Sequence, residues 1–369
     1  MYRYTDIRND WRLLDEETFE VPSGIELLSH EAFASPNGPH VEQVRPSSVI
    51  GPFRMVPALH HLLYALQLLM RCRNHSVLIV NGSSPLWLAV GLLNQTLFCL
   101  RKRRVLCWAL HAEPSTRFSR EIMRWGLKGT SLSLLWSKNT VSSHVEFFQL
   151  PETRFLFMPY KANHSKELPY KLSLDNYVFA GGNSKRDYDT LLTAIKGTGI
   201  PLVISSTDPE VKSSLRDLSN VTVVSAVEPE FAELQAASRF VVMPMHEEGI
   251  RGAGEANICN AMWHGKPVIA ADNISAHEYI QHGQTGFVVP SGDTKALRDH
   301  IIRLWNNPEL TRTMGEAAHR HVVENFTQSS FSQRLRRLSA ILGTEEFFVP
   351  HIRTTKIQLE AETPSRQAS

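Results

Sequence analysis

Several features that define common protein classes are scarce in this sequence of 369 residues. It has only four cysteines, at positions 72, 99, 107 and 259, and none forms a Cys-x-x-Cys pair. That scarcity disfavours a disulfide scaffold and a structural zinc site, and it makes a reducing cytoplasm the expected compartment. The charged segment 1–20 lacks the apolar stretch of a signal peptide. The most apolar stretch, Pro85–Leu100, contains Asn-Gln-Thr and is shorter than the roughly 20 residues of a membrane-spanning helix.

An excess of charge of one sign is also missing. Lys and Arg number 39 against 37 Asp and Glu, for a net charge of +2. Proteins that cover nucleic acid carry a strong basic excess, so no nucleic-acid partner is expected. The hydrophobic fraction of 42% excludes a largely disordered chain, and 20 Gly with 20 Pro exclude a fibrous one. At ~100–200 residues per domain, the length suits a two-domain protein that binds something small.

Basic residues nevertheless gather in one region of the chain. Arg101–Arg104 follows the apolar stretch, and Arg120, Arg124 and Lys128 surround Trp125. Basic and aromatic residues together can hold a protein against anionic lipid, so the sequence leaves open a peripheral contact at the inner membrane face. The alternative is that the apolar stretch is a buried helix of an α/β domain and that the cations are simply solvated.

Short apolar runs alternate with helical patterns along the chain, whereas residues 1–40 show no clear period. The expected strands span residues 76–80, 105–110, 131–136, 154–158, 176–180, 201–205, 221–224, 240–243 and 267–270. The expected helices span residues 57–71, 85–100, 188–196, 230–237, 255–263 and 331–342, and two more begin after Asp293 and at Pro308. This alternation predicts parallel sheets with helices on both faces.

A polar, proline-containing segment, His164–Leu174, interrupts the pattern before it starts again. We therefore expect an α/β protein with an N-terminal domain over 1–170, a C-terminal domain over 171–343 and a loose tail over 344–369. The last helix could pack on the N-terminal domain instead of its own. Such domains bind ligands outside the carboxyl ends of their strands, so the strand-to-helix loops are the candidate site.

The first candidate loop follows the expected strand 176–180. Gly181 and Gly182 would let backbone amides approach a ligand, and the next helix begins close by. Lys185 and Arg186 would add charge-assisted hydrogen bonds to an anion. The alternative is an ordinary glycine turn with two solvated cations. The loop lacks the Gly-x-Gly-x-x-Gly pattern of dinucleotide-binding folds, which disfavours NAD.

The second candidate loop combines acidic, basic and glycine residues between a strand and a helix, in the segment 245–255 (MHEEGIRGAGE). Arg251 is placed to neutralise a diphosphate. The backbone amides expected to cradle that diphosphate belong to Gly252, Ala253, Gly254 and Glu255. Like charges repel, so Glu247 or Glu248 would have to face sugar hydroxyls. The alternative is a solvated acidic loop that only caps the helix.

Residues 240–326 resemble the C-terminal half of a glycosyltransferase family 4 enzyme of the GT-B fold. The likeness rests on four segments, namely 260–270 (NAMWHGKPVIA), 278–293 (EYIQHGQTGFVVPSGD), 307–310 (NPEL) and 314–318 (MGEAA). The Gly-Gly loop with 188–194 (YDTLLTA) is similar to the family's first diphosphate loop. The resemblance covers most of residues 100–340 and is firm after 175. It implies two Rossmann-like domains that face a central cleft.

The sequence departs from the family at its paired glutamates. Aligned on Ala261-Met262, the second glutamate position holds Asn260 and the first holds Gly252. Either Glu247 and Glu255, which have the same spacing, take over, or Asn260 hydrogen-bonds the ribose. Arg186 matches the family's lysine, and Lys185 or Arg251 would replace its arginine.

The resemblance implies a retaining, metal-independent glycosyltransferase of the hexosyltransferase type that needs no cofactor. Its substrates would be a nucleotide-sugar donor and a glycan or lipid-linked acceptor, in cell-surface polysaccharide or glycolipid assembly. Backbone amides and cations would stabilise the leaving diphosphate, and Glu247 or Glu248 would orient the sugar. His111 matches a family histidine near the donor sugar. The alternatives are a GT-B nucleotide-sugar epimerase and a non-catalytic protein that binds nucleotide sugar.

Overall fold

The computed structural model describes residues 4–16, 25–29, 41–47, 56–72, 76–163, 176–213, 218–246 and 249–344. The linker expected at 164–174 and the tail expected from 344 lie, except for Thr344, outside the described residues. The chain divides into two compact units. Unit 1 comprises residues 1–134, 150–156 and 332–369, and unit 2 comprises residues 135–149 and 157–331. All four cysteines are free.

The first six-stranded sheet has the strand order β2-β1-β3-β4-β5-β6. Its strands are β1 (Glu26–Ser29), β2 (Val41–Gln43), β3 (Ser76–Asn81), β4 (Arg104–Trp108), β5 (Leu132–Leu135) and β6 (Phe155–Phe157). Neighbours from β2 to β5 pair in parallel. Leu78 and Leu106 are buried in the middle of the sheet, as expected of parallel strands covered on both faces.

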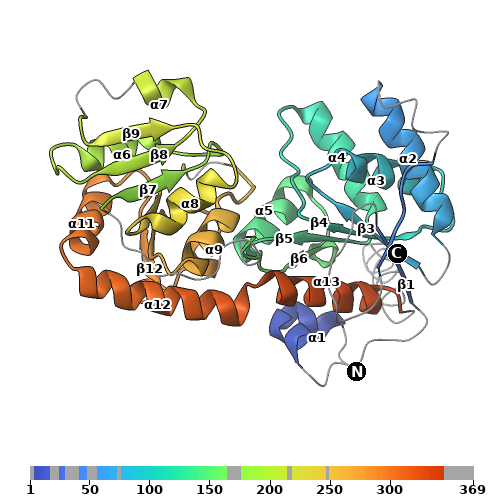
Figure 1. The fold of residues 1–369 in the computed structure, drawn as a ribbon. Coiled ribbons are helices and arrows are strands. Elements are labelled where there is room, and N and C mark those ends of the chain that lie inside the picture. The colour runs from blue at the N-terminus through green and yellow to red at the C-terminus, as the bar shows by residue number, and fades with distance from the viewer. Residues whose placement is uncertain are drawn as a thin grey trace, which may run out of the picture. The chain divides into compact units, whose positions relative to one another are not determined.

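Helices flank this sheet (Figure 1). They are α1 (Tyr4–Asn9), η1 (Trp11–Asp15), α2 (Pro57–Arg71), α3 (Leu86–Thr96), α4 (Arg117–Gly129), η3 (Glu152–Arg154) and the last part of α13 (Gln328–Leu342), whereas α5 (Lys138–Phe148) belongs to unit 2. Helices α3 and α4 approach so closely that a Cβ on Gly91 would clash with the backbone of Gly126. Asn94 of α3 donates to the carbonyl of Gly129, 2.7 Å away.

The far end of α13 is tied to the N-terminal segment. The fully buried Arg334 donates to Asp15 at 2.6 to 3.0 Å and lies 4.2 Å from the ring centre of Trp11. Arg337 donates to the carbonyl of Leu14 at 2.7 Å. These contacts place the last part of the helix, from residue 332, in unit 1.

The second six-stranded sheet has the order β12-β11-β10-β7-β8-β9, and all its neighbours pair in parallel. Its strands are β7 (Val178–Gly181), β8 (Leu202–Ser205), β9 (Val221–Val224), β10 (Val241–Met243), β11 (Val268–Ala271) and β12 (Gly286–Val289). The surrounding helices are α6 (Tyr188–Ile195), α7 (Pro209–Ser213), α8 (Glu230–Ala237), α9 (Glu255–Trp263), α10 (Ala276–Tyr279), α11 (Thr294–Trp305) and α12 (Pro308–Asn325).

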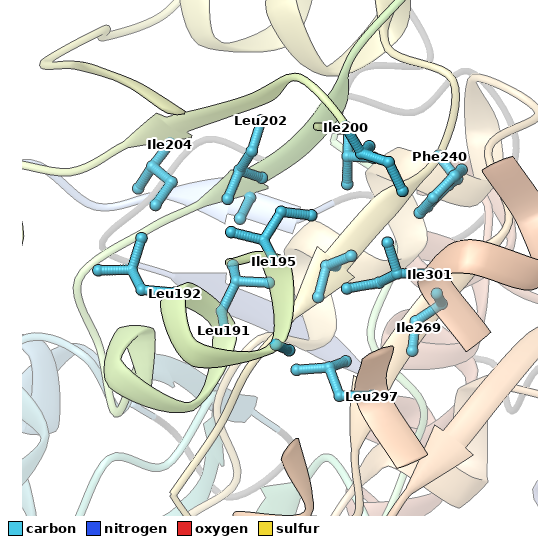
Figure 2. Close-up of a cluster of buried hydrophobic side chains, with 14 of the residues drawn as sticks. Leu191, Leu192, Ile195, Ile200, Leu202, Ile204, Phe240, Ile269, Leu297 and Ile301 are labelled. Carbon is cyan, nitrogen blue, oxygen red and sulfur yellow. The ribbon is translucent and has the colours of Figure 1, made fainter. Parts of the chain in front are cut away.

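The core of unit 2 explains why the apolar periodicity of this half predicts its elements so well. Figure 2 shows Leu191 and Ile195 of α6 next to Leu202 of β8, with Ile301 of α11 and Ile269 of β11 nearby. All five are nearly or fully buried. Helix and strand periods therefore coincide with real packing faces, which makes these elements visible in the sequence.

Every expected strand and helix has a counterpart, and the predicted α/β class with two parallel sheets is confirmed. The predicted helix at 85–100 is too long, because α3 ends at Thr96 and Asn94 turns inward to bind backbone groups near β4. The sequence did not indicate β1, β2, β12, α1, α4, α5 or α7. Strands β1 (ELLS) and β2 (VEQ) contain few apolar residues, so neither stands out as an apolar run. Helix α4 was missed although Phe118, Ile122 and Trp125 recur at helical spacing.

Candidate functional site

The two candidate loops lie side by side, because the strands that precede them, β7 and β10, are neighbours in the sheet. Their backbones also pair. Arg186 forms an antiparallel bridge with Met245, the amide of His246 donates to the carbonyl of Lys185 at 3.0 Å, and the amide of Asp187 donates to that of Pro244 at 3.1 Å. Segments 60 residues apart in sequence thus form one surface at the carboxyl edge of the sheet.

Arg186 is folded against the loop that carries it. Its Nε donates to the carbonyl of Gly181 at 3.0 Å, and its Nη1 donates to the carbonyl of Ser184 at 2.7 Å. Gly182, with φ of 104°, leaves the space that Nη2 fills, since a Cβ there would lie 2.8 Å from that atom. Burial lowers the pKa of Arg186, although nearby Tyr188 and Glu255 raise it. The guanidinium is held in one place, partly shielded from water.

The other two predicted cations bridge the loops. Lys185, at a left-handed φ of 55°, donates from Nζ to the carbonyl of Arg251 at 3.0 Å. Arg251 in turn places its Nη2 3.3 Å from the Ser184 hydroxyl. The structure therefore brings together Lys185, Arg186 and Arg251, which the sequence separates by up to 66 residues.

Helix α9 begins at the same place. Gly254, its N-cap at φ of 95°, has no side chain to cap the first turn. The first amides of a helix have no partner within it and carry its positive dipole end, so they favour an anion. Ala253 is buried just before this turn. At Gly252 an added Cβ would clash with Glu255 Oε1 and lie 3.2 Å from Ser275 Oγ.

Glu255, the first residue of α9, is 6% exposed, and its Oε1 is buried without a hydrogen-bond partner. Burial raises the pKa of this carboxyl. Its own backbone amide, the Ser275 hydroxyl and the charges of Arg251 and Arg186 oppose that rise. An acidic group therefore lies inside a cationic surface, with one oxygen unused.

Asn260 lies one and a half turns further along α9 and is buried. Its Oδ1 accepts from the backbone amide of Asn163 at 2.7 Å. In this structure the amide side chain thus holds the segment that follows β6, and its contact with a ribose stays a prediction.

Of the three catalytic candidates, the structure describes only His111. Glu247 and Glu248 lie outside the described residues. His111, exposed in unit 1 after β4, has its Nδ1 3.1 Å from the Ser83 hydroxyl. Its backbone amide donates to the carbonyl of Gly82 at 3.4 Å. The loops after β3 and β4 thus meet at His111, at the carboxyl edge of the first sheet.

A shallow pocket of about 220 Å³, including space open to solvent, lies beside the candidate loops. Asp187, Asp293, Pro244 and Met245 are among the residues that line it. Asp187 uses its carboxylate to cap α6, accepting from the amide and the hydroxyl of Thr190 at 3.0 and 2.6 Å. Two carboxylates make this pocket unsuited to an anion. Among the described residues, no group of three His, Cys, Asp or Glu side chains is placed to hold a metal ion.

Three polar residues of the site were not singled out by the sequence. Ser184 contacts both arginines, Asn257 donates to the carbonyl of Gly181 at 3.3 Å, and Ser275 contacts Glu255. Ser184 lies in the first candidate loop, and Asn257 lies in the helix that follows the second. Their places in the sequence were the signal that could have identified them. Ser275 follows β11, which lies next to β10 in the sheet. This strand order brings Ser275 to the site.

Part of this chain is similar in sequence to known glycosyltransferases. Residues 180–307 match the family model "Glycosyl transferases group 1", so this part of the chain is a glycosyltransferase domain. The D-rhamnosyltransferase WbpZ of Pseudomonas aeruginosa is 31% identical over 37% of this chain and 37% of its own. The N-acetyl-alpha-D-glucosaminyl L-malate synthase of Bacillus anthracis is 31% identical over 34% of this chain and 33% of its own. The chain therefore spans about a third of the length of these relatives.

Solved structures extend the likeness to most of the chain. The Anabaena Alr3699/HepE structure in complex with UDP has a TM-score of 0.60 at 15% identity, over 80% of this chain and 84% of that one. A glycosyltransferase from Rickettsia africae ESF-5 has a TM-score of 0.60 at 16% identity, over 83% and 85%. These neighbours show that the fold is GT-B, with two Rossmann-like domains, as predicted.

Proposed function

We propose that this protein is a glycosyltransferase that moves a sugar from a nucleoside-diphosphate donor to an acceptor hydroxyl. One observation supports this most. Lys185, Arg186 and Arg251 meet the uncapped start of α9 at the carboxyl edge of a parallel sheet, inside a glycosyltransferase domain. That is the place and the charge that a donor diphosphate requires.

The same residues account for the chemistry. Transfer leaves negative charge on the departing diphosphate, and donors fixed in advance at that position lower the barrier. We propose that Arg186 and Arg251 with the amides of Gly252–Glu255 perform this role in place of a divalent metal. By resemblance the reaction retains the anomeric configuration, which proton NMR of the product would report.

We further propose that the acceptor is a glycan or a lipid-linked sugar in cell-surface polysaccharide assembly. Support comes from relatives with names of this kind, such as the capsular polysaccharide biosynthesis glycosyltransferase CapM of Staphylococcus aureus, 31% identical over 26% of this chain. His111, at the carboxyl edge of the first sheet, is our candidate for contact with the donor sugar.

A thermal-shift panel of UDP, GDP and ADP with their glucose and mannose conjugates tests the proposed function. A ligand at ~100 times its dissociation constant adds about 2.7 kcal/mol to the free energy of unfolding, so the cognate base should raise the Tm clearly. Release of free sugar or transfer to an acceptor then separates an enzyme from a binding protein. If none of these nucleotides stabilises the chain, the proposed function is wrong.

We also propose that unit 1 contacts a membrane surface through α4. Phe118 and Trp125 are 76% and 52% exposed and lie two turns apart on one face of this helix. Arg117, Arg124 and Lys128 follow the adjoining face. Between residues 97 and 128 the chain has eight basic residues and two acidic ones, in a protein of net charge +2. No described helix is long and apolar enough to cross a membrane, and an aromatic face beside a basic one suits an anionic lipid surface.

Replacing Phe118 and Trp125 together by serine should lower binding to vesicles of phosphatidylglycerol and phosphatidylcholine by about tenfold or more, because both aromatic anchors are lost. Co-sedimentation measures the bound fraction. Val227→Ser is the matched control, since Val227 is 71% exposed in unit 2. High salt should weaken wild-type binding. Equal binding by the double variant and the control would contradict the membrane contact.

A further inference from the structure

The least expected group of the site is a carboxyl where an anion should bind. Glu255 is the first residue of α9, the helix whose uncapped start forms the proposed diphosphate cradle. Its side chain points into the protein. It is 6% exposed, and it lies against Gly252. An ionised carboxylate there would repel the phosphates that the cations attract.

Two details show how the conflict is resolved. Oε1 of Glu255 is buried and has no hydrogen-bond partner, although buried polar atoms are almost always paired. The groups that face the carboxyl are Arg186 from the first loop, Arg251 from the second, Ser275 before α10, Cys259 on α9 and Tyr279 on α10. The two arginines favour its ionised form, and burial favours its neutral form more strongly.

We propose that Glu255 binds the donor diphosphate as a neutral carboxyl, whose hydroxyl donates to a phosphate oxygen. This inference rests on the proposed function. Where the free chain has Glu255 ionised, the donor brings one proton from solvent onto the carboxylate as it binds. No bond of the donor changes in this step. Glu255 is then a hydrogen-bond donor beside Arg186 and Arg251, and the unpartnered oxygen of the free chain acquires its partner.

The donor's own charge acts on this carboxyl. A diphosphate diester carries two negative charges, and both disfavour an ionised carboxylate beside them. Because the donor's charge favours the protonated form further, proton uptake and donor binding strengthen each other.

Isothermal titration calorimetry with UDP-glucose tests this, with GDP-mannose and ADP-glucose run beside it. The diphosphate diester itself does not titrate in this range, and up to about pH 8 the bases do not either, so a proton taken up there belongs to the protein. Titrations in PIPES, HEPES and Tris, which differ in ionisation enthalpy, yield the protons taken up per donor. We expect uptake to rise toward about one proton, and wild-type affinity to fall, as pH rises from about 6 to about 9.

Two substitutions of Glu255 distinguish a neutral carboxyl that donates a hydrogen bond from other roles of this side chain. Glu255→Gln keeps a hydrogen-bond donor of nearly the same shape, so it should bind at least as tightly as wild type and take up no proton. Glu255→Ala should bind about tenfold more weakly, because the donor group is gone. Urea unfolding checks that both variants fold.

Two results would overturn the inference. One is wild-type affinity and proton uptake that do not change with pH. The other is Glu255→Gln binding as weakly as Glu255→Ala, which would mean that an ionised carboxylate accepts from a sugar or ribose hydroxyl. If no nucleotide sugar binds the wild type at all, the proposed function fails instead, so the two failures are distinct.

Discussion

Replacing Arg186 by alanine should lower the affinity for the nucleotide-sugar donor by about 100-fold and lower kcat/KM at least as much. A hydrogen bond to a charged group contributes about 1.5–3 kcal/mol, and each ~1.4 kcal/mol is tenfold. Arg186 is fixed by the carbonyls of Gly181 and Ser184, so little ordering is needed when the donor arrives. Calorimetry and initial rates at varied donor concentration measure the two losses.

The main objection is that Arg186→Ala also removes the arginine's bonds to the backbone. Arg298 is the matched control, because its Nη1 donates to the carbonyls of Ala194 and Lys196 at 2.8 and 2.7 Å, in the same unit. Arg298→Ala should lower the Tm without affecting donor affinity. Arg186→Lys keeps the charge but lacks the planar guanidinium. Its donor affinity should lie between those of the wild type and Arg186→Ala. Equal donor affinity in Arg186→Ala and Arg298→Ala would contradict the assignment.

Replacing Gly252 by alanine should destabilise the chain by about 1–3 kcal/mol, the usual penalty for overpacking, and should abolish measurable donor binding. The added methyl group would take the place of Oε1 of Glu255, so this buried carboxyl would have to shift. Displacing that carboxyl would also disturb the start of α9. Urea unfolding reports the first effect and calorimetry the second.

A double-mutant cycle isolates the cause of the instability. In a Glu255→Ala background the next atom facing the new methyl group is Ser275 Oγ at 3.2 Å, a tight but tolerable contact. Gly252→Ala should then be nearly neutral for stability, so the two substitutions should couple by about 1 kcal/mol or more. Additive effects would mean that Gly252 and Glu255 do not share this space.

The sequence predicts the location of this site because each signal is local. Glycines and cations follow directly after apolar runs, and parallel strands bring their carboxyl ends to one edge. The two candidate loops therefore meet as expected. The packing of α6 and α11 on β8 makes the helical and strand periods readable in the same way.

What the sequence does not predict depends on contacts between distant residues. Asn260 accepts from Asn163, 97 residues away, and no local pattern carries that partner. The bond from Lys185 to the Arg251 carbonyl depends on the pairing of two loops that flank different strands. Burial of Glu255 follows from Ser275 and Tyr279 packing around α9, which tertiary structure alone reveals.

A crystal structure of the protein with its cognate nucleoside diphosphate, chosen by thermal shift, tests the central claim most directly. We expect the two phosphates at the amides of Gly252–Glu255, within hydrogen-bond distance of Arg186 or Arg251. Phosphates bound elsewhere in unit 2, with no density at the start of α9, would contradict it.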